Sequence, residues 1–385
     1  MSSDLKLFFQ DLQKRGLIAN KANLENFHQL RPEEKVIYLG IDCTGERLHI
    51  GHLFLYFQTV RFAKEGFKVL LVLGGATSKI GDPSDKVKER PLLEEKQIKG
   101  YLEKIKLQLE KILIEPKKIE EKDLSPLEQF YPDNSQLLNS IYWILKINRD
   151  EKKEQQWKDY LRYIWPLKTN LNFQILNNKG WLEKINFVNF LRQTGKYLTV
   201  AYLSSKETVK RRINTGITFL EFSYPLVQAY DFYYLYENYN CRGQLGGSDQ
   251  WGNLTTGLEL IKKIHSGKRV KTFAFNFPLL TDKEGKKLSK SESGQRILWL
   301  NSDKKDFYDF FRNMTDEQAK IYIKQFTFLS ENQIEELLKL VKENPPQLRI
   351  LQWILYELIY WLNYGESSKE SVLLKDISKN TLFEK

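Results

Sequence analysis

Cysteine is scarce in this chain, and no apolar stretch approaches the length that spans a membrane. Cys43 and Cys241 are its two cysteines among 385 residues. Two thiols are too few for a disulfide framework or a structural zinc site, so we expect a reducing compartment inside a cell. The first sixteen residues contain Asp4 and Asp11 and lack a secretory signal and a convincing transit peptide. We therefore expect a protein that is neither secreted nor embedded in a membrane.

The composition describes a folded protein with an excess of positive charge. Hydrophobic residues make up 41% of the chain and aromatic residues 13%, and the length leaves room for a sizeable core and two domains. The formal net charge of +11 favours a polyanionic partner or a nucleotide substrate. Charge alone is weak support, because a lysine- and asparagine-rich composition can also reflect codon bias.

The rest of the chain is organised around Tyr38–Leu53, which reads Y-L-G-I-D-C-T-G-E-R-L-H-I-G-H-L. It opens as a buried strand, breaks at Gly40, and ends on two histidines at the start of an apolar run. A helix N-terminus offers unpaired N–H groups and a positive dipole end to phosphate. A surface helix with chance histidines is the alternative, and Asp42, Thr44 and Gly51 argue against it.

A second strand follows after one helix. Residues Leu53–Lys64 are predicted to be helical, and Lys68–Leu73 is a continuous apolar strand that runs into G-G-A-T and then I-G-D-P. Strand, helix and strand imply a right-handed βαβ unit and a parallel sheet. The turns then fall at the carboxyl ends of the strands, where open α/β sheets bind ligands. The sequence thus predicts an α/β fold with a Rossmann-like parallel sheet, followed by a small all-helical domain.

Residues from about 115 to 172 differ in character, because charge clusters alternate there with aromatic patches. They carry no catalytic constellation. We interpret them as an insertion that packs on the domain or at a subunit interface. Contact of their basic and aromatic residues with RNA is the weaker alternative.

The segment Phe219–Tyr236 is predicted to be a helix that presents Tyr224, Gln228 and Asp231 on one face. Pro225 is expected at or near its first turn, where the missing N–H is harmless. The alternative is an amphipathic helix whose polar residues face solvent. Because the other face is strongly apolar, this narrow polar stripe favours a binding site.

Two later motifs combine glycine or serine with charge. Gln244–Asn253 reads Q-L-G-G-S-D-Q-W-G-N before a helix over Leu254–Ile264, and its alternative is an ordinary helix cap. Residues 286–291 read K-K-L-S-K-S and suit a mobile phosphate clamp. Taken alone, the second motif fits a solvated basic turn better.

Together, H-I-G-H at His49–His52, G-S-D-Q-W-G-N at Gly247–Asn253 and K-L-S-K-S at Lys287–Ser291 resemble the class I aminoacyl-tRNA synthetases. With Y-P-L-V-Q-A-Y-D, they resemble the bacterial and organellar type of tyrosyl-tRNA synthetase. The resemblance runs from about residue 4 to 380. It implies a catalytic Rossmann-type domain over 1–304 with an insertion at about 116–172, and a helical anticodon-side domain over 305–385. The small C-terminal RNA-binding domain of most bacterial-type members is expected to be absent.

The resemblance also implies roles for individual residues in forming tyrosyl-adenylate from tyrosine and ATP and charging tRNA(Tyr). Tyrosine would be bound by Tyr38, Asp82, Tyr224, Gln228, Asp231 and Gln250. ATP would be bound by Gly40, Asp42, His49, Gly51, His52, Gly247, Asp249, Leu288, Ser289 and Lys290, with Asp249 on the ribose. The phosphates and the departing pyrophosphate would be stabilised by Thr44, His49, His52, Lys86, Arg90, Lys287, Lys290 and Ser291. Mg²⁺ would accompany ATP, and no protein metal site is expected.

The chain departs from the family pattern in two loops and leaves alternatives open. Cys43 and Gly45 stand where Pro and Ala are usual, and K-L-S-K-S replaces the common K-F-G-K-T. The alternatives are a tryptophan-specific synthetase, a synthetase-fold protein for RNA binding or assembly, and a nucleotidyl transferase acting on a small cofactor. The expected partners are tRNA(Tyr), L-tyrosine, ATP and a second copy of the chain in a homodimer. The compartment is bacterial cytoplasm or the mitochondrial matrix.

Overall fold

The computed structural model describes residues 2–84, 91–113, 171–214, 216–266, 268–281, 288, 297–343, 351–352, 355–356 and 359. The chain divides into two compact units. The first contains Met1–Glu110 and Leu171–Leu280, and the second contains Lys111–Asn170 and Thr281–Lys385. Most of the expected insertion lies outside the described residues. The domain limits given above, with their boundary at residue 304, stay predictions.

The first unit contains a six-stranded sheet with the order β1-β6-β5-β2-β3-β4. Strand β1 pairs antiparallel with β6, and all other neighbours are parallel. The strands are β1 (Asn20–Ala22), β2 (Val36–Ile41), β3 (Lys68–Leu73), β4 (Phe173–Asn177), β5 (Gly243–Gly247) and β6 (Phe273–Phe277). The predicted α/β fold with a mainly parallel sheet is confirmed.

The βαβ unit that carries the opening motif consists of β2, α3 (Ile50–Lys64) and β3. In its register Tyr38 lies opposite Leu70, and Gly40 still pairs with Val72. The strand therefore runs past the glycine at which we expected it to break. Helix α3 begins three residues before the predicted Leu53, because the His49 side chain caps it by accepting a hydrogen bond from the Gly51 N–H at 3.1 Å.

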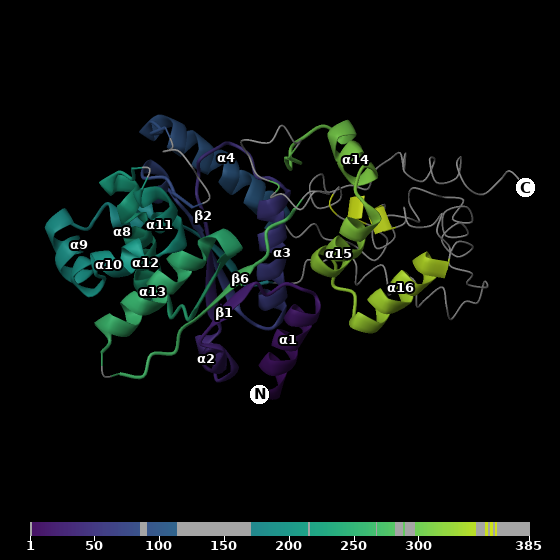
Figure 1. The fold of residues 1–385 in the computed structure, drawn as a ribbon, viewed down its shortest axis with the longest axis horizontal. Helices are drawn as coiled ribbons and strands as arrows, with labels where there is room; N and C mark the ends of the chain where they lie inside the picture. Colours follow the sequence, from purple (N-terminus) through teal and green to yellow (C-terminus); the bar gives the residue numbers. More distant parts are fainter. Residues whose placement is uncertain are drawn as a thin grey trace, which may run out of the picture. The chain divides into compact units, whose positions relative to one another are not determined.

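Helices cover both faces of this sheet (Figure 1). On one face, α12 (Phe219–Tyr239) and α13 (Trp251–Ile264) pack on a cluster that includes Tyr38, Leu70 and Val72. Helices α1 (Ser2–Lys14), α2 (Leu24–His28) and α3 lie on the other side. The aromatic rings packed around Phe27 belong to Phe8, Phe9, Phe62, Phe67, Phe273 and Phe275. Each fully buried phenylalanine contributes about 1.5–3 kcal/mol.

Helix α12 begins at the predicted Phe219, well before its proline. Thr218 caps it by accepting from the Glu221 N–H at 3.3 Å, and Pro225 therefore lies inside the helix. The expectation that Pro225 sits at or near the first turn is wrong. A buried ion pair of 2.9 Å between Arg212 and Glu221 holds this early first turn in place. The helix ends at Tyr239, and the next residue, Asn240, adopts a left-handed conformation with φ of 55°.

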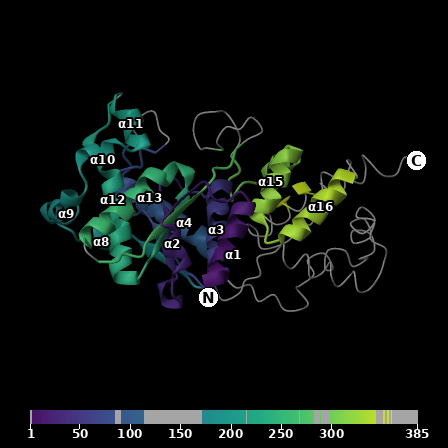
Figure 2. The same cartoon turned by 60° about the horizontal axis from the view of Figure 1, so that its bottom comes forward.

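Short helices lie between β4 and α12 in the chain. They are α8 (Lys179–Leu182), α9 (Phe187–Gln193), α10 (Val200–Ser204) and α11 (Glu207–Ile213). Figures 1 and 2 show them gathered at one end of the first unit. A longer helix, α4 (Glu95–Leu113), precedes β4 in the chain, and buries Ile98, Ile105 and Leu109 at helical spacing.

The described part of the second unit is helical, as expected for the region after the basic loop. It contains α14 (Lys304–Arg312), α15 (Asp316–Phe326) and α16 (Glu331–Glu343). Asp303 caps α14 and Thr315 caps α15, and Phe307, Phe311 and Phe326 are fully buried. Among the residues described in either unit, no helix combines the length and apolarity needed to cross a bilayer.

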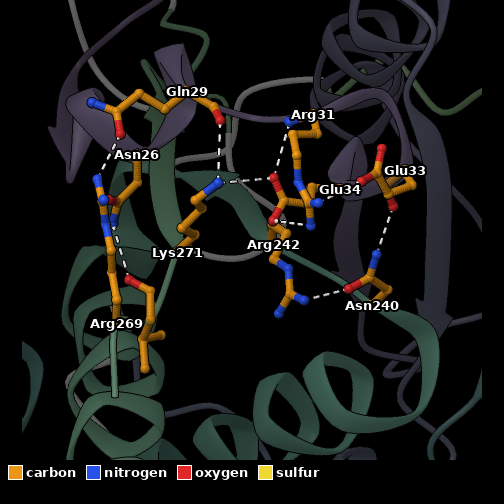
Figure 3. A network of polar contacts seen from close by, with 10 residues as sticks. Asn26, Gln29, Arg31, Glu33, Glu34, Asn240, Arg242, Arg269 and Lys271 are labelled. Carbon is orange, nitrogen blue, oxygen red and sulfur yellow. Dashed lines mark hydrogen bonds and ion pairs between the residues drawn. The ribbon is translucent and has the colours of Figure 1, made fainter. Parts of the chain in front are cut away.

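Polar contacts join the amino ends of the parallel strands β2, β5 and β6 (Figure 3). Glu34, just before β2, accepts from Arg31 at 3.2 Å and from Lys271, just before β6, at 3.2 Å. Asn240 donates to the Glu33 carbonyl at 2.6 Å and accepts from Arg242, just before β5. This network holds the three strands in register at the edge opposite their carboxyl ends.

Replacing Glu34 by glutamine is expected to lower the free energy of unfolding by about 2–3 kcal/mol near pH 7. Burial acts to raise the pKa of Glu34, but hydrogen bonds from Arg31 and the Lys271 charge lower it from 4.5 to about 2. The lowered pKa stabilises the fold above about pH 4.5, and this stabilisation is lost as the pH falls toward 2. Urea unfolding at several pH values tests both points.

Glu33→Gln is the matched control for this experiment. The Glu33 side chain is 58% exposed, although its carboxylate also lies 3.0 Å from Arg31. An exposed ion pair contributes little, so the control should change stability by less than about 1 kcal/mol. Equal losses in the two variants, or a loss at Glu34→Gln that persists at about pH 2, would contradict the role given to this network.

Candidate active site

The carboxyl ends of four parallel strands bring polar residues to one edge of the sheet. Asp42 follows β2, Thr77 lies in the turn after β3, Asn178 follows β4, and Gln250 lies in the turn after β5. Helix α12 adds Tyr224, Gln228 and Asp231 from the sheet face on which it packs. Segments more than two hundred residues apart in the chain are thereby joined in one cluster of side chains.

Tyr38 and Asp231 form the most deeply buried part of this cluster. Tyr38 is 1% exposed, and its hydroxyl has no hydrogen-bond partner among the described residues. Burial and then the Asp231 charge raise the pKa of Tyr38. The Asp231 carboxylate accepts from the Trp181 indole N–H at 2.7 Å and from the Asn178 amide at 3.0 Å. A buried acceptor therefore lies close to a buried hydroxyl that lacks a partner.

The carboxyl group of Asp231 has a pKa close to neutral pH. Burial raises its pKa from 3.8 to about 7, against the two hydrogen bonds from Asn178 and Trp181, which lower it. The negative charge of Asp42 adds to the upward shift. A ligand hydroxyl that donates to Asp231 favours its ionised form.

Asp42 links the first turn of the site to helix α12. Its carboxylate accepts from the Thr77 hydroxyl and from the Tyr224 hydroxyl, each at 2.8 Å. Gly74 makes this approach possible, since a Cβ there would lie 2.2 Å from an Asp42 oxygen and 2.5 Å from the Thr77 oxygen. The glycine-rich turn after β3 is thus required by close contacts with the site.

Three carboxylates act on the hydroxyl of Tyr224. Burial is the largest cause that raises its pKa, and the charges of Asp42, Asp82 and Asp231 follow. Asp82 is 8% exposed and accepts from the Ser84 N–H at 3.0 Å and from the Gln250 amide at 2.5 Å. The Oε1 atom of Gln228 is buried and has no hydrogen-bond partner in the described structure. This concentration of negative charge and acceptors suits a cationic group.

His49 and His52 cap α3 as a pair. Nδ1 of His49 accepts from the Gly51 N–H at 3.1 Å, and Nδ1 of His52 accepts from the His49 N–H at 3.2 Å. Because each Nδ1 accepts a hydrogen bond, the ring proton of each neutral histidine lies on Nε2. The ring centroids are 3.9 Å apart. In the neutral form, each ring of this pair thus carries its N–H donor on Nε2, beside a helix N-terminus.

Glycines bring the backbone close to polar side chains in this part of the site. A Cβ on Gly51 would lie 2.9 Å from the His49 ring, and one on Gly247 would lie 2.6 Å from an Asp249 oxygen. Asp249 and Gln250 belong to the short 3₁₀ turn η5 (Ser248–Gln250) between β5 and α13. Gly40 is exposed at the end of β2, and Thr44 is half-buried in the turn that follows.

Several predicted residues cannot be located in this geometry. The residues outside the described ranges are Lys86, Arg90, Lys287, Ser289, Lys290 and Ser291. Leu288 is half-buried and belongs to the second unit. Their proposed roles stay predictions. Among the described residues, no group of three or more His, Cys, Asp or Glu side chains is placed to hold a metal ion.

Sequence reasoning missed three residues of the cluster. Thr77, Asn178 and Trp181 each make hydrogen bonds that join Asp42 or Asp231 to the rest of the site. Thr77 stands in the G-G-A-T turn without being assigned a role. Asn178 and Trp181 follow β4, whose sequence F-Q-I-L-N was not recognised as a strand. The available signal was its short group of apolar residues, Phe173, Ile175 and Leu176.

Comparison with known proteins shows which family the sequence matches. The chain matches the family of tRNA synthetases class I (W and Y) over residues 31–373. It is 36% identical over 376 residues to a tyrosine–tRNA ligase of Flavobacterium psychrophilum, covering 96% of this chain and 74% of that protein. The tyrosine–tRNA ligase of Geobacillus stearothermophilus is 36% identical over 362 residues, 93% of this chain and 73% of that protein.

Solved structures show the same fold. A C-terminally truncated mitochondrial tyrosyl-tRNA synthetase of Aspergillus nidulans matches with a TM-score of 0.71 and 24% identity, covering 98% of this chain and 97% of that one. The corresponding protein of Coccidioides posadasii matches with a TM-score of 0.66 and 23% identity, covering 98% and 94%. At these identities the likeness is one of architecture.

Proposed function

This chain belongs to the class I tRNA synthetases for tryptophan and tyrosine, and we propose that it is a tyrosine–tRNA ligase that works through the residue roles given below. The relatives named tyrosine–tRNA ligase are 34–36% identical to the chain and cover most of its length. The reaction activates tyrosine with ATP to give tyrosyl-adenylate and pyrophosphate. The tyrosyl group is then transferred to the 3′ end of tRNA(Tyr).

The observation that carries the choice of tyrosine is the buried pair of Tyr38 and Asp231. A phenol hydroxyl both donates and accepts a hydrogen bond, whereas an indole N–H only donates. Asp231 supplies the acceptor, and the Tyr38 hydroxyl, which lacks a partner among the described residues, supplies a donor. The pair therefore suits the side chain of tyrosine better than that of tryptophan.

The ammonium group of tyrosine is assigned to the acidic side of the site. The carboxylates of Asp42 and Asp82 place negative charge around the hydroxyl of Tyr224, and Gln228 of the same helix has a buried acceptor. An ammonium group offers three donors and a positive charge that offsets the mutual repulsion of these carboxylates. Gln250, hydrogen-bonded to Asp82, is assigned to the neighbourhood of the substrate carboxylate.

The nucleotide is assigned to the turns around α3 and α13. Asp249 would hold the ribose, and Thr44, His49 and His52 would stabilise charge that develops on the phosphates. Because the attacking carboxylate of tyrosine is already ionised, no general base is needed. The step then depends on positioning and on preorganised donors. Lys86, Arg90 and the 287–291 loop would neutralise pyrophosphate, and Mg²⁺ enters as the ion that accompanies ATP.

Exposed apolar side chains supply a surface for the proposed homodimer. Of the eleven large hydrophobic residues that are exposed in the described structure, seven lie between residues 187 and 220. Phe187 is 64% exposed, Val200 is 70% exposed and Phe219 is 70% exposed. They belong to α9, α10 and the start of α12, which gather at one end of the first unit (Figure 2). Exposed apolar side chains concentrated in this way are typical of a subunit interface.

Phe219→Asp is expected to convert the dimer to a monomer at micromolar concentration, because it places an unpaired charge in the proposed interface. Sedimentation velocity measures the change. Leu107→Asp is the control, since Leu107 is 66% exposed on α4, outside this segment. A Phe219→Asp protein that stays dimeric, or a wild-type protein that is monomeric, would contradict the assignment of this surface.

ATP–pyrophosphate exchange with each amino acid, followed by charging of total tRNA, tests the function. Tyrosine should support exchange and be attached to one tRNA species. Exchange with tryptophan in place of tyrosine would establish the second specificity of the family. A lack of exchange with every amino acid, in a correctly folded protein that binds RNA, would instead establish a binding or assembly role.

A further inference from the structure

A continuous series of hydrogen bonds crosses the site between Asp231 and Asp42. The Asn178 amide donates to Asp231 at 3.0 Å and to the Thr77 hydroxyl at 3.0 Å. The Thr77 hydroxyl donates to Asp42 at 2.8 Å. Thr77 is 3% exposed and Asn178 is 1% exposed, so water is largely excluded from these bonds. Two carboxylates with different proposed ligands are thus joined through two neutral side chains.

The direction of every bond in this series is determined by chemistry. The Asn178 Oδ1 atom accepts from the Ala76 N–H at 2.8 Å, so its Nδ2 atom must face Asp231 and Thr77. Both Nδ2 hydrogens are then used. The Thr77 oxygen accepts one of them and donates its single proton to Asp42. Neither link can reverse without leaving a buried polar group unpaired.

We infer that Thr77 is a positioning residue that couples the tyrosine half of the site to the nucleotide half. This inference rests on the proposed function, in which Asp231 binds the phenol hydroxyl and Asp42 faces the substrate ammonium, and on the sequence-based assignment of Asp42 to ATP. A phenol that donates to Asp231 holds this carboxylate ionised and fixes Asn178. Asn178 in turn fixes the only proton with which Thr77 orients Asp42.

The surroundings of Thr77 are built to permit this contact. Gly74 is needed here, because a Cβ at this position would clash with the side-chain oxygens of Asp42 and Thr77. The second Asp42 oxygen is oriented by Tyr224, whose hydroxyl donates at 2.8 Å. Asp42 is therefore held from two sides, once by a residue of the tyrosine half-site and once through Asn178 and Thr77. A mutual increase in the affinities for tyrosine and ATP follows, equal in both directions.

Thr77→Val tests the coupling, because valine keeps the shape and removes the hydroxyl. Equilibrium dialysis measures the tyrosine Kd with and without α,β-methylene-ATP, and pyrophosphate exchange gives kcat and KM. In the wild type we expect the ATP analogue to tighten tyrosine binding at least fivefold. In Thr77→Val this factor should fall to nearly one and kcat should fall about ten- to hundredfold, while tyrosine Kd without nucleotide changes less than about threefold.

Two further variants make the result specific. Thr77→Ser keeps the hydroxyl and should restore both the coupling and kcat. Thr59→Val makes the same change at a fully buried threonine of α3, whose hydroxyl donates to the Tyr56 carbonyl at 2.7 Å. It should leave the coupling unchanged whatever its effect on stability. If the role of Thr77 were purely structural, Thr59→Val and Thr77→Val would change the coupling factor and kcat alike. The affinity for tyrosine without nucleotide would then fall as well.

The outcomes also separate this inference from the proposed function. A wild-type protein that exchanges pyrophosphate with tyrosine, together with a Thr77→Val protein that keeps the full coupling factor, would overturn the role of Thr77 and leave the function standing. An unmodified protein that neither binds tyrosine nor exchanges pyrophosphate in its presence would overturn both.

Discussion

Asp231→Ala is expected to abolish most of the preference for tyrosine over phenylalanine. In the wild type, phenylalanine would leave the buried Asp231 carboxylate and the Tyr38 hydroxyl without the bonds that the substrate hydroxyl supplies. Sites built around a substrate hydroxyl reject the analogue that lacks it by about 10⁴–10⁵-fold, a figure already known for tyrosyl-tRNA synthetases themselves and not deduced from this structure. With Asp231 removed, the ratio of kcat/KM values for the two amino acids should fall by at least about a hundredfold.

The assay is best made above about pH 7.5, because burial raises the pKa of Asp231 to about 7. Asp231→Asn keeps the shape and removes the charge, which tests the result if the alanine variant folds poorly. Trp181 and Asn178 lose their acceptor in the alanine variant, so its thermal unfolding should be measured beside its activity. An unchanged tyrosine-to-phenylalanine ratio in both folded variants would rule out the assignment of the phenol to Asp231.

The elements predicted from the sequence are those with strong local signals. Lys68–Leu73 is predicted and observed with the same bounds, because a continuous run of apolar residues suits a strand buried on both faces. The β5 strand reads G-Q-L-G-G, and its three glycines have low strand propensity. A Cβ on Gly243 would lie 2.2 Å from the Phe273 ring, so the glycine there is required by packing between neighbouring strands. Such a requirement arises only in the folded protein.

The residues of the candidate site also divide into those with a local sequence signal and those without one. Residues of the H-I-G-H, Y-P-L-V-Q-A-Y-D and G-S-D-Q-W-G-N motifs could be named because motif and spacing mark them. Thr77, Asn178 and Trp181 have no motif, and their role depends on β3 and β4 lying side by side. The prediction that Pro225 lies at or near the first turn of α12 was wrong for a related reason. A proline usually starts a helix, but the Thr218 cap and the buried Arg212–Glu221 pair hold a first turn that begins earlier.

His49→Asn is expected to lower the rate of tyrosyl-adenylate formation by about 10²–10³-fold and to leave tyrosine binding unchanged. The loss corresponds to removal of one preorganised donor from a developing charge. In the structure Nδ1 of His49 caps α3, so the neutral ring carries its proton on Nε2, and the proposed function assigns this N–H to phosphate. Asparagine is a good N-cap and can accept from the Gly51 N–H with its side-chain oxygen, but it has no group at the Nε2 position.

The contrast with His49→Ala separates catalysis from folding. Alanine removes the cap as well as the donor. The rate of adenylate formation in His49→Ala should therefore fall about as much as in His49→Asn, and its free energy of unfolding should fall by an additional amount of about 0.5–2 kcal/mol. Stopped-flow measurement of adenylate formation and thermal unfolding of each variant read the two effects independently. His265→Asn is the matched control, since its ring packs against Tyr236 at 5.3 Å, and its rate should equal that of the wild type. A normal rate in His49→Asn would show that His49 serves the helix alone, and the phosphate charge would then fall to His52 and the basic residues.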